Sequence, residues 1–226
     1  MEREFKIINT EDGSNSIFVP SLQETYHSTF GAVTESQYVF IQEGLNYFLN
    51  ANNKSQVNIL EVGFGTGLNA LLTLSFCEQW NFPIDYTTLE PFPLDEEITN
   101  TLNFCENQLL FRKELKFQQL HAADWGKKVA ITKNFELSKI KKRLEEFKHP
   151  HQFDLIYFDA FAPNKQPEVW EIDVLAHATG MLAENGMLVT YCASRQFRRN
   201  LTALGLEVEV LKGPPGKLEM VRAVKT

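Results

Sequence analysis

The fold is decided by the stretch Ile59-Leu60-Glu61-Val62-Gly63-Phe64-Gly65-Thr66-Gly67-Leu68-Asn69. An apolar run, typical of a buried strand, passes into three glycines at alternate positions and then into a helical pattern. Glycine adopts backbone angles that a Cβ forbids, and it lets the main chain approach a ligand closely. The amides that open the following helix are then available as donors. The stretch therefore predicts a strand, a turn that cradles a nucleotide-like ligand, and a helix.

The spacing of these glycines separates two classes of nucleotide site. A dinucleotide fold uses Gly-x-Gly-x-x-Gly with an acidic residue about 20 positions further on. Here Leu68 stands where the third of those glycines should fall, and Gly67 comes one residue too early. The next expected strand, residues 84–89, ends in Glu90, which suits a carboxylate that accepts both hydroxyls of a ribose. The combination resembles the S-adenosylmethionine site of class I methyltransferases more than a nicotinamide site. The glycines alone leave another ligand, or a plain tight turn, open.

The bulk composition predicts a single cytoplasmic domain. A chain of 226 residues with 43% hydrophobic content can bury a full sheet core. We expect one domain over 1–226, in which an N-terminal extension (1–56) covers the site and a Rossmann-like core occupies 57–226. No apolar run approaches the roughly 20 residues that cross a bilayer. The first residues lack the apolar centre of a secretion signal, so we expect no membrane partner.

Thiol and metal chemistry are not expected. Cys77, Cys105 and Cys192 are odd in number and lack metal or disulfide spacing, which favours buried reduced thiols. His149 and His151 flank a proline in a loop signature. Two such ligands without a third do not define a metal site.

The net charge of −7 hides an uneven distribution. Residues 1–126 carry 6 Lys and Arg against 17 Asp and Glu, whereas 127–150 carry 8 against 3 and 193–226 carry 7 against 3. The total argues against a chain that binds nucleic acid over its whole surface. The two basic segments are either solvated faces or a local nucleic-acid surface.

Strands and helices alternate along the chain, which predicts an α/β fold. The expected strands are 57–62, 84–89, 153–158, 187–192, and two closing strands near 206–211 and 218–224. The expected helices are one that ends near residue 49, then 68–79, 94–109, 168–182 and a basic helix at 196–204. Residues 128–132 and 135–140 predict a β-hairpin whose second arm joins the sheet as its third strand. A single helix over that segment is the competing interpretation.

Asp159 is the strongest catalytic candidate, because it follows the apolar run 153–158 and leads the sequence Asp159-Ala160-Phe161-Ala162-Pro163. Ligands of open α/β sheets bind beyond the carboxyl ends of the strands, so the glycine turn, Glu90 and Asp159 should share one cleft. Amino-methylating enzymes often place an acid or amide, a proline and an aromatic ring here. A capped turn is the purely structural alternative. A desolvated Asp159 could stabilise an acceptor ammonium and take its proton; whether it is a base or only orients the amine stays open.

Five blocks of sequence resemble the tRNA 5-methylaminomethyl-2-thiouridine methyltransferase family, in its stand-alone form without a fused oxidase. The blocks are Tyr26-His27-Ser28 with Gly31-Ala32 and Glu35-Ser36; Gly63 to Asn69; Glu90-Pro91-Phe92-Pro93-Leu94; Phe158 to Pro163; and Gly213-Pro214-Pro215-Gly216-Lys217 with Glu219-Met220. The resemblance implies a class I fold with a mostly parallel seven-stranded sheet and S-adenosylmethionine as cofactor. It also implies methylation of the 5-aminomethyl amine on a wobble uridine, often 2-thiolated, with the tRNA anticodon arm as partner. We expect no FAD, since 226 residues leave no space for the oxidase.

The resemblance also assigns roles residue by residue. It makes Asp159 the catalytic residue that faces the amine. The cofactor-binding candidates are Glu61, Gly63, Phe64, Gly65, Gly67, Asn69, Glu90, Asp124, Glu35 and Tyr26. The substrate-binding candidates are Phe161, Pro163 and, because they lie on or beside elements expected to end near the cleft, Arg195, Arg198, Arg199, Lys212 and Lys217. In this set, basic side chains contact phosphates without reading sequence, and Phe161 stacks an unpaired base.

Two departures from the family pattern stand out. The family usually places an acid near the adenine just after its third strand, but this chain has Lys141-Lys142-Arg143 there. We expect Asp124, or else Glu145, to substitute. Near the carboxyl end a basic pair is common, whereas here Lys217 is followed by Leu218, so the tRNA-facing surface is expected to be weaker.

Several rival functions remain at the level of sequence. The first is a class I transferase that acts on another amine, in a small molecule or protein, or an aminopropyl transferase. The second is a non-catalytic RNA-binding module on the same fold, which the cleft acids disfavour. A nicotinamide oxidoreductase comes third, because the glycine spacing already argues against it.

Overall fold

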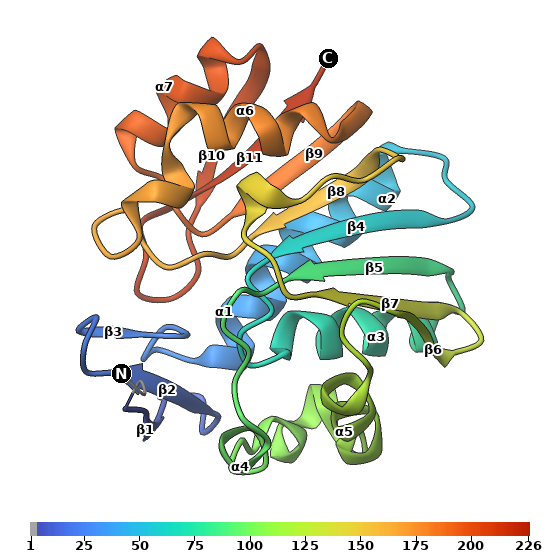
Figure 1. Cartoon of the computed structure of the whole chain (residues 1–226), viewed down its shortest axis with the longest axis vertical. Coiled ribbons are helices and arrows are strands. Elements are labelled where there is room, and N and C mark those ends of the chain that lie inside the picture. The colour runs from blue at the N-terminus through green and yellow to red at the C-terminus, as the bar shows by residue number, and fades with distance from the viewer. Residues whose placement is uncertain (1–3) are drawn as a thin grey trace.

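The computed structural model describes residues 4–226 and has one large twisted sheet at its centre (Figure 1). The sheet has eight strands in the order β10-β11-β9-β8-β4-β5-β7-β6. The strands are β4 (Val57–Val62), β5 (Ile84–Leu89), β6 (Lys128–Thr132), β7 (Phe135–Ile140), β8 (Phe153–Phe158), β9 (Leu182–Thr190), β10 (Leu206–Lys212) and β11 (Glu219–Lys225).

The pairing is mostly parallel, as the sequence predicts. β4 pairs in parallel with β5 and β8, β5 pairs with β7, and β8 pairs with β9. β11 is antiparallel to both β9 and β10. The antiparallel β6–β7 hairpin is confirmed, with β7 as the strand next to β5. Seven strands therefore make the expected sheet, and β6 adds an eighth at its edge.

The central strands are buried on both faces, because their side chains alternate between two hydrophobic clusters. Ile59 and Tyr157 belong to one cluster, and their neighbours Leu60 and Phe158 belong to the other. Such continuous apolar strands are typical of parallel sheets with helices on both sides. Burial on both faces leaves the carboxyl ends of the strands as the place where polar side chains can gather.

Helices cover the two faces separately. α3 (Leu68–Trp80) and a helical stretch formed by α1 (Ala32–Ser36), the π-helical η1 (Gln37–Asn46) and α2 (Tyr47–Ala51) pack on the first cluster. α6 (Ile172–Gly180) and α7 (Arg195–Ala203) pack on the second. The expected helices at 68–79 and 196–204 are thereby confirmed, each within one residue of its predicted ends.

The N-terminal segment forms a small antiparallel sheet of its own. Its strands are β1 (Lys6–Asn9), β2 (Asn15–Val19) and β3 (Glu24–Thr25), which lie beside the start of α1 (Figure 1). Hydrogen bonds attach it to the rest of the chain; among them, the backbone N–H of Asn15 donates to Asn103 Oδ1 at 2.7 Å, and His27 Nε2 lies 2.7 Å from Thr66 Oγ1. The second contact ties the extension to the glycine turn.

The predicted helix over 94–109 is wrong. Only α4 (Glu96–Thr99) is α-helical there, and it is followed by two 3₁₀ turns, η2 (Phe104–Glu106) and η3 (Gln108–Leu110). Asparagine side chains compete with the helix for backbone groups. Asn103 bonds the N-terminal segment, and Asn107 Oδ1 accepts from the backbone N–H of Leu109. The sequence analysis also missed α5 (Glu114–Ala122).

The segment before β9 differs from its prediction as well. Instead of one helix over 168–182, the chain forms a 3₁₀ turn, η5 (Pro167–Trp170), then α6, which ends at Gly180. β9 begins at Leu182 instead of Met187, and its register with β8 shifts between Phe153 and Leu155. Gly186 lies in that irregularity, where a Cβ would approach the backbone oxygen of Ala183 to 2.7 Å. Gly186 thus lies at a bulge inside the strand.

Candidate functional site

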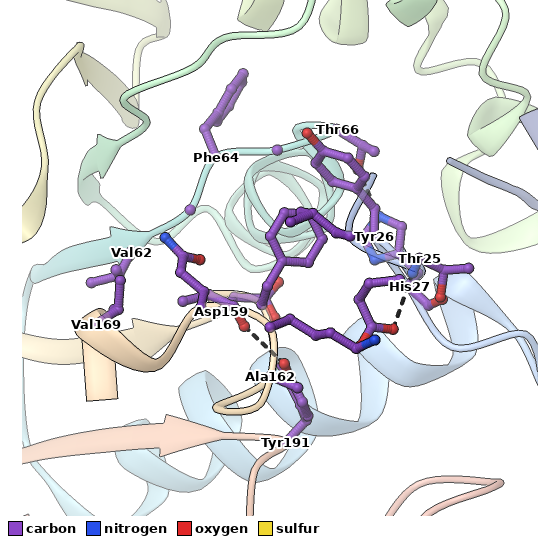
Figure 2. A pocket seen from close by; sticks show the side chains of 18 of the residues that line it. Thr25, Tyr26, His27, Val62, Phe64, Thr66, Asp159, Ala162, Val169 and Tyr191 are labelled. Carbon is purple, nitrogen blue, oxygen red and sulfur yellow. Dashed lines mark hydrogen bonds between the residues drawn. The ribbon is translucent and has the colours of Figure 1, made fainter. Parts of the chain in front are cut away.

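A cavity of about 620 Å³ lies beyond the carboxyl ends of β4, β5 and β8 (Figure 2). Ten of the residues predicted from sequence line it: Tyr26, Glu35, Gly63, Phe64, Gly65, Asn69, Glu90, Asp159, Phe161 and Lys217. They come from the N-terminal segment, three strand ends and the turn before β11. The structure therefore brings together segments that the sequence separates by up to 191 residues, from Tyr26 to Lys217.

The glycine turn is shaped by close approaches that exclude side chains. Gly63 has φ +95°, and a Cβ there would lie 2.7 Å from the backbone oxygen of Asp159. Gly65 has φ +51°, and its Cβ would lie 3.1 Å from the Tyr26 ring. Both positions combine a left-handed backbone with a crowded neighbour, so only glycine is tolerated without strain. The turn thus presents its backbone, and not side chains, to the cavity.

Glu90 is oriented by the turn itself. Its Oε2 accepts a hydrogen bond from the backbone N–H of Gly65 at 3.1 Å, and its Oε1 accepts from the N–H of Phe92 at 2.9 Å. The side chain is therefore fixed at the cavity wall, beside the glycine turn.

Asp159 projects into the cavity beside this turn (Figure 2). Its backbone N–H donates to the oxygen of Val62 at 3.0 Å, and its Oδ2 accepts from Asn69 Nδ2 at 2.7 Å. Burial raises the pKa of Asp159 to about 7, against the opposing effect of the Asn69 hydrogen bond. A carboxyl group with such a pKa exchanges its proton near neutral pH, as a general acid or base must.

A charged pair crosses the cavity next to Asp159. The Lys217 ammonium pairs with Glu35 Oε1, and the backbone N–H of Ser28 donates to Glu35 Oε2 at 2.8 Å. The same ammonium lies 3.8 Å from the centroid of the Tyr191 ring. Lys217 is therefore held inside the cavity and does not extend from the surface towards solvent.

Glu61 lies beneath the cavity and does not line it. The side chain is fully buried, and its Oε2 accepts from Thr88 Oγ1 at 2.7 Å. Within residues 4–226, its Oε1 has no hydrogen-bond partner. Burial raises the pKa of Glu61 to about 8. Its carboxyl group therefore holds its proton at neutral pH, outside the cavity lining.

Seven further predicted residues lie outside the cavity lining: Gly67, Asp124, Pro163, Arg195, Arg198, Arg199 and Lys212. Asp124 lies apart from the cavity lining. It follows α5 and not a strand end, its side chain is 64% exposed, and it pairs with Lys127 at 2.8 Å. Glu145, the second choice, does line the cavity, together with Lys142 and Arg143.

The cavity also contains residues that sequence analysis missed. Tyr191 follows β9, and its hydroxyl donates to the oxygen of Ala160 at 2.8 Å. Lys165 donates to the backbone oxygen of Gln23 at 3.0 Å and so links two loops of the cavity wall. His27 is buried, and burial lowers its pKa to about 4. Position just after a parallel strand was a usable signal for Tyr191; the other two depend on tertiary contacts.

Some predictions concern absences. Across 4–226 the side chains contain no group of three His, Cys, Asp or Glu residues placed to hold a metal ion. None of the helices in that range is both long and apolar enough to span a bilayer. Cys77, Cys105 and Cys192 are buried free thiols.

Comparison with known proteins shows which families and proteins this chain resembles. The family model of S-adenosyl-L-methionine-dependent methyltransferases matches residues 101–226. The tRNA 5-methylaminomethyl-2-thiouridine biosynthesis bifunctional protein MnmC of Leptospira interrogans is 30% identical over 210 residues, which cover 88% of this chain and 32% of that protein. The same-named protein of Aeromonas salmonicida is 30% identical over 217 residues, again 88% and 32%. The chain spans about a third of the length of these curated relatives.

Solved structures agree on the fold. The crystal structure of MNMC2 from Aquifex aeolicus superimposes with a TM-score of 0.78 at 24% identity, covering 98% of this chain and 70% of that one. Spermidine synthase from Thermotoga maritima superimposes with a TM-score of 0.53 at 14% identity, covering 99% and 73%. With its strand order, its glycine turn and the match of the family model over more than half of its length, this chain belongs to the S-adenosyl-L-methionine-dependent methyltransferases of class I fold.

Proposed function

We propose that this chain transfers a methyl group from S-adenosylmethionine to the amine of a 5-aminomethyl group on a uridine, often 2-thiolated, at the tRNA wobble position. The observation that carries the proposal is the half-buried carboxyl group of Asp159, which lines the cavity beside the glycine turn and accepts a hydrogen bond from Asn69 at 2.7 Å. The names of the relatives, which specify tRNA 5-methylaminomethyl-2-thiouridine biosynthesis, support this choice of substrate.

The residues of the cavity fit the cofactor. The turn at Gly63 and Gly65 is a cradle that a Cβ would fill, and a bare backbone is what a closely bound amino-acid and ribose portion requires. Glu90 is held at the cavity wall by backbone N–H groups of Gly65 and Phe92, and a carboxylate at this position suits the ribose hydroxyls. We assign the adenine side to the segment that contains Glu145, in place of Asp124, because it lines the cavity.

The proposed chemistry requires the protein to position the methyl donor and the amine, and to accept one proton from the amine. S-adenosylmethionine supplies an electrophilic methyl group on a sulfonium. An alkylamine has a pKa near that of lysine, about 10, so it arrives as an ammonium. Asp159 would hold that ammonium and accept a proton from it, which leaves the nitrogen with a free lone pair.

The energetics of this proton transfer favour a buried site. Proton transfer from an amine of pKa about 10 to an ordinary aspartate of pKa about 3.9 costs about 8 kcal/mol, whereas transfer to a carboxyl group of pKa about 7 costs about 4 kcal/mol. Burial penalises charged forms, so a neutral amine beside a neutral Asp159 becomes comparatively favourable. The same burial that raises the pKa of Asp159 thus helps to produce the reactive form of the acceptor.

The tRNA would meet the protein at the rim of the cavity. Arg195, Arg199 and Lys212 are exposed around α7 and the end of β10, and Lys142 and Lys165 lie in the cavity wall. We assign these side chains to phosphates. Phe161, which meets the Tyr26 ring edge to face at 5.0 Å, would stack the extruded base.

The organisation of the chain follows from the same proposal. We propose a single methyltransferase domain over 1–226, in which the segment 1–56 covers the site. Tyr26, His27 and Glu35 support it, because all three line the cavity. An anticodon arm as substrate would place the chain in the cytoplasm.

The test is mass analysis of nucleosides. tRNA that carries 5-aminomethyl-2-thiouridine is incubated with the protein and S-adenosylmethionine labelled on its methyl group, then digested. Label on the aminomethyl nitrogen supports the proposal. Label found only in protein or in small amines would refute it and favour a transferase with another acceptor.

A further inference from the structure

Lys217 occupies an unusual position for a lysine that follows a surface turn. It comes directly after the turn Gly213-Pro214-Pro215-Gly216, yet its side chain is only 30% exposed and its ammonium lies within the cavity. The ammonium pairs with the carboxylate of Glu35, whose side chain is 8% exposed. It also lies 3.8 Å from the centroid of the Tyr191 ring.

The two groups that hold this ammonium are themselves fixed. Glu35 accepts the backbone N–H of Ser28 with its second carboxylate oxygen, at 2.8 Å. Tyr191 is anchored by its hydroxyl, which donates to the backbone oxygen of Ala160 at 2.8 Å. The Glu35 carboxylate on one side and the face of the Tyr191 ring on the other form a preorganised binding site for an ammonium ion. These are the groups that recognise an alkylammonium ion in proteins.

This site lies within electrostatic reach of Asp159. The negative charge of Glu35 raises the pKa of Asp159, and the positive charge of Lys217 lowers it. Asp159, Glu35, Tyr191 and Lys217 all line the same cavity. An ammonium held between Glu35 and Tyr191 is therefore an ammonium held beside the carboxyl group that we assign to proton transfer.

We propose that Glu35 and Tyr191 form an alkylammonium subsite, and that Lys217 occupies this subsite until the ammonium of the acceptor displaces it. The inference rests on the proposed function, since it concerns the amine that becomes methylated. Lys217 is then an internal substitute for the substrate and not a phosphate contact. A charged amine that displaces the Lys217 ammonium takes over its contacts with Glu35 and Tyr191. A neutral analogue cannot replace these contacts, so it gains no affinity from the subsite.

Charge balance explains why an exchange is favoured over simple addition. A largely buried carboxylate without a partner is costly, and removal of one partner of such a pair is strongly destabilising. Exchange of one ammonium for another keeps Glu35 paired at every stage. The lysine side chain can leave by rotation about its flexible stem. The backbone can stay in place, because the turn packs closely on Phe30 at Gly216.

The test compares two nucleosides by calorimetry, in the presence of S-adenosylhomocysteine. 5-Aminomethyluridine carries the ammonium, and 5-hydroxymethyluridine is its neutral analogue. Lys217→Met removes the internal occupant, so it should tighten binding of the aminomethyl nucleoside about tenfold if Lys217 fills the subsite about nine-tenths of the time. Binding of the hydroxymethyl nucleoside should not change. Glu35→Gln should abolish the preference for the amine.

The matched control is Lys54→Met. Lys54 also pairs with a nearly buried carboxylate, that of Asp154 at 2.8 Å, with 38% and 8% exposed side chains, but it lies outside the cavity lining. The control should bind both nucleosides as the wild type does. Unchanged or weaker binding of the aminomethyl nucleoside by Lys217→Met, relative to the hydroxymethyl nucleoside, would overturn the inference.

A measurement on the wild type keeps the inference testable if a variant fails to fold. The side-chain ammonium signal of Lys217 in a ¹⁵N NMR spectrum should change on addition of methylammonium chloride and stay unchanged with sodium chloride at equal ionic strength. An unresponsive signal would contradict the exchange. Methylation of tRNA is scored separately, so labelled tRNA without the Lys217 effect refutes only this inference, and unlabelled tRNA refutes the proposed function.

Discussion

The hydrogen bond from Asn69 to Asp159 should set the pH at which the enzyme becomes active. Asn69 Nδ2 donates to Asp159 Oδ2 at 2.7 Å, and Asn69 itself is 3% exposed. The bond stabilises the ionised carboxylate, so it lowers the pKa of Asp159 against the larger effect of burial, and the balance is about 7. Asn69→Ala removes this donor, and the pKa of Asp159 should therefore rise.

The size of the shift follows from the strength of the bond. A hydrogen bond to a charged group contributes about 1.5–3 kcal/mol, and one pKa unit corresponds to 1.36 kcal/mol. The pH midpoint of kcat/KM should therefore move from about 7 in the wild type to about 8–9 in Asn69→Ala. At pH 7 the variant should be about 10- to 100-fold slower, and at pH 9.5 most of this loss should disappear.

The assay is methyl transfer to tRNA that carries 5-aminomethyluridine, measured from pH 5.5 to 9.5 at saturating S-adenosylmethionine. Thr73→Val is the matched control, because its hydroxyl lies one turn along α3 and donates to the backbone oxygen of Asn69 at 2.7 Å. The control should keep the wild-type midpoint. A loss of activity in Asn69→Ala that is equal at every pH would refute the reasoning, since it would show a purely structural effect.

Three further predictions concern the turn, the buried acid and the rim. Gly63→Ala should weaken S-adenosylmethionine binding at least tenfold in calorimetry. The control Gly205→Ala has a similar φ of +85° but open space around it, so it should leave binding intact and cost about 1 kcal/mol of stability. Equal binding by both variants would contradict the close-approach argument. Burial raises the pKa of Glu61 from 4.5 to about 8, so between these pH values the folded chain holds a proton that the unfolded chain releases, and stability falls as pH rises across that window. In thermal melts, Glu61→Gln should therefore be more stable than the wild type by on the order of a few kcal/mol at pH 8 and by little at pH 4.5. An equal difference in stability at both pH values would count against this prediction. Arg195→Ala should lower tRNA affinity and reduce the slope of the logarithm of the binding constant against the logarithm of salt concentration by about 0.7–0.9. The control Arg112→Ala removes a side chain that is also exposed and outside the cavity lining, so it should change neither quantity. An unchanged slope for Arg195→Ala would show that this side chain does not contact a phosphate.

Local sequence was sufficient to predict the strands that carry the residues of the site. The bounds of β4, β5, β8 and both arms of the hairpin coincide with those expected from alternation and apolar runs. A parallel sheet with such strands has only a few places where polar residues can converge. The presence of Glu90 and Asp159 in one cavity with the glycine turn followed from that rule.

What sequence could not provide depends on contacts between distant segments. Asn103 bonds Asn15, 88 residues away, so the segment 94–109 is tied to the N-terminal sheet and does not form one helix. The partner of Lys217 is Glu35, 182 residues away, so a lysine assigned to phosphate proves to be held in the cavity. Asp124 followed a missed helix, and its position relative to the sheet could not be inferred without that helix.

The central claim is that donor and amine meet beside Asp159, above the glycine turn. It is tested most directly by a crystal structure of the chain with S-adenosylhomocysteine and 5-aminomethyluridine bound together. The account predicts the amine nitrogen within about 3 Å of the Asp159 carboxylate, with the sulfur of the cofactor facing that nitrogen. An amine bound elsewhere, or an Asp159 side chain turned away from both ligands, would contradict it.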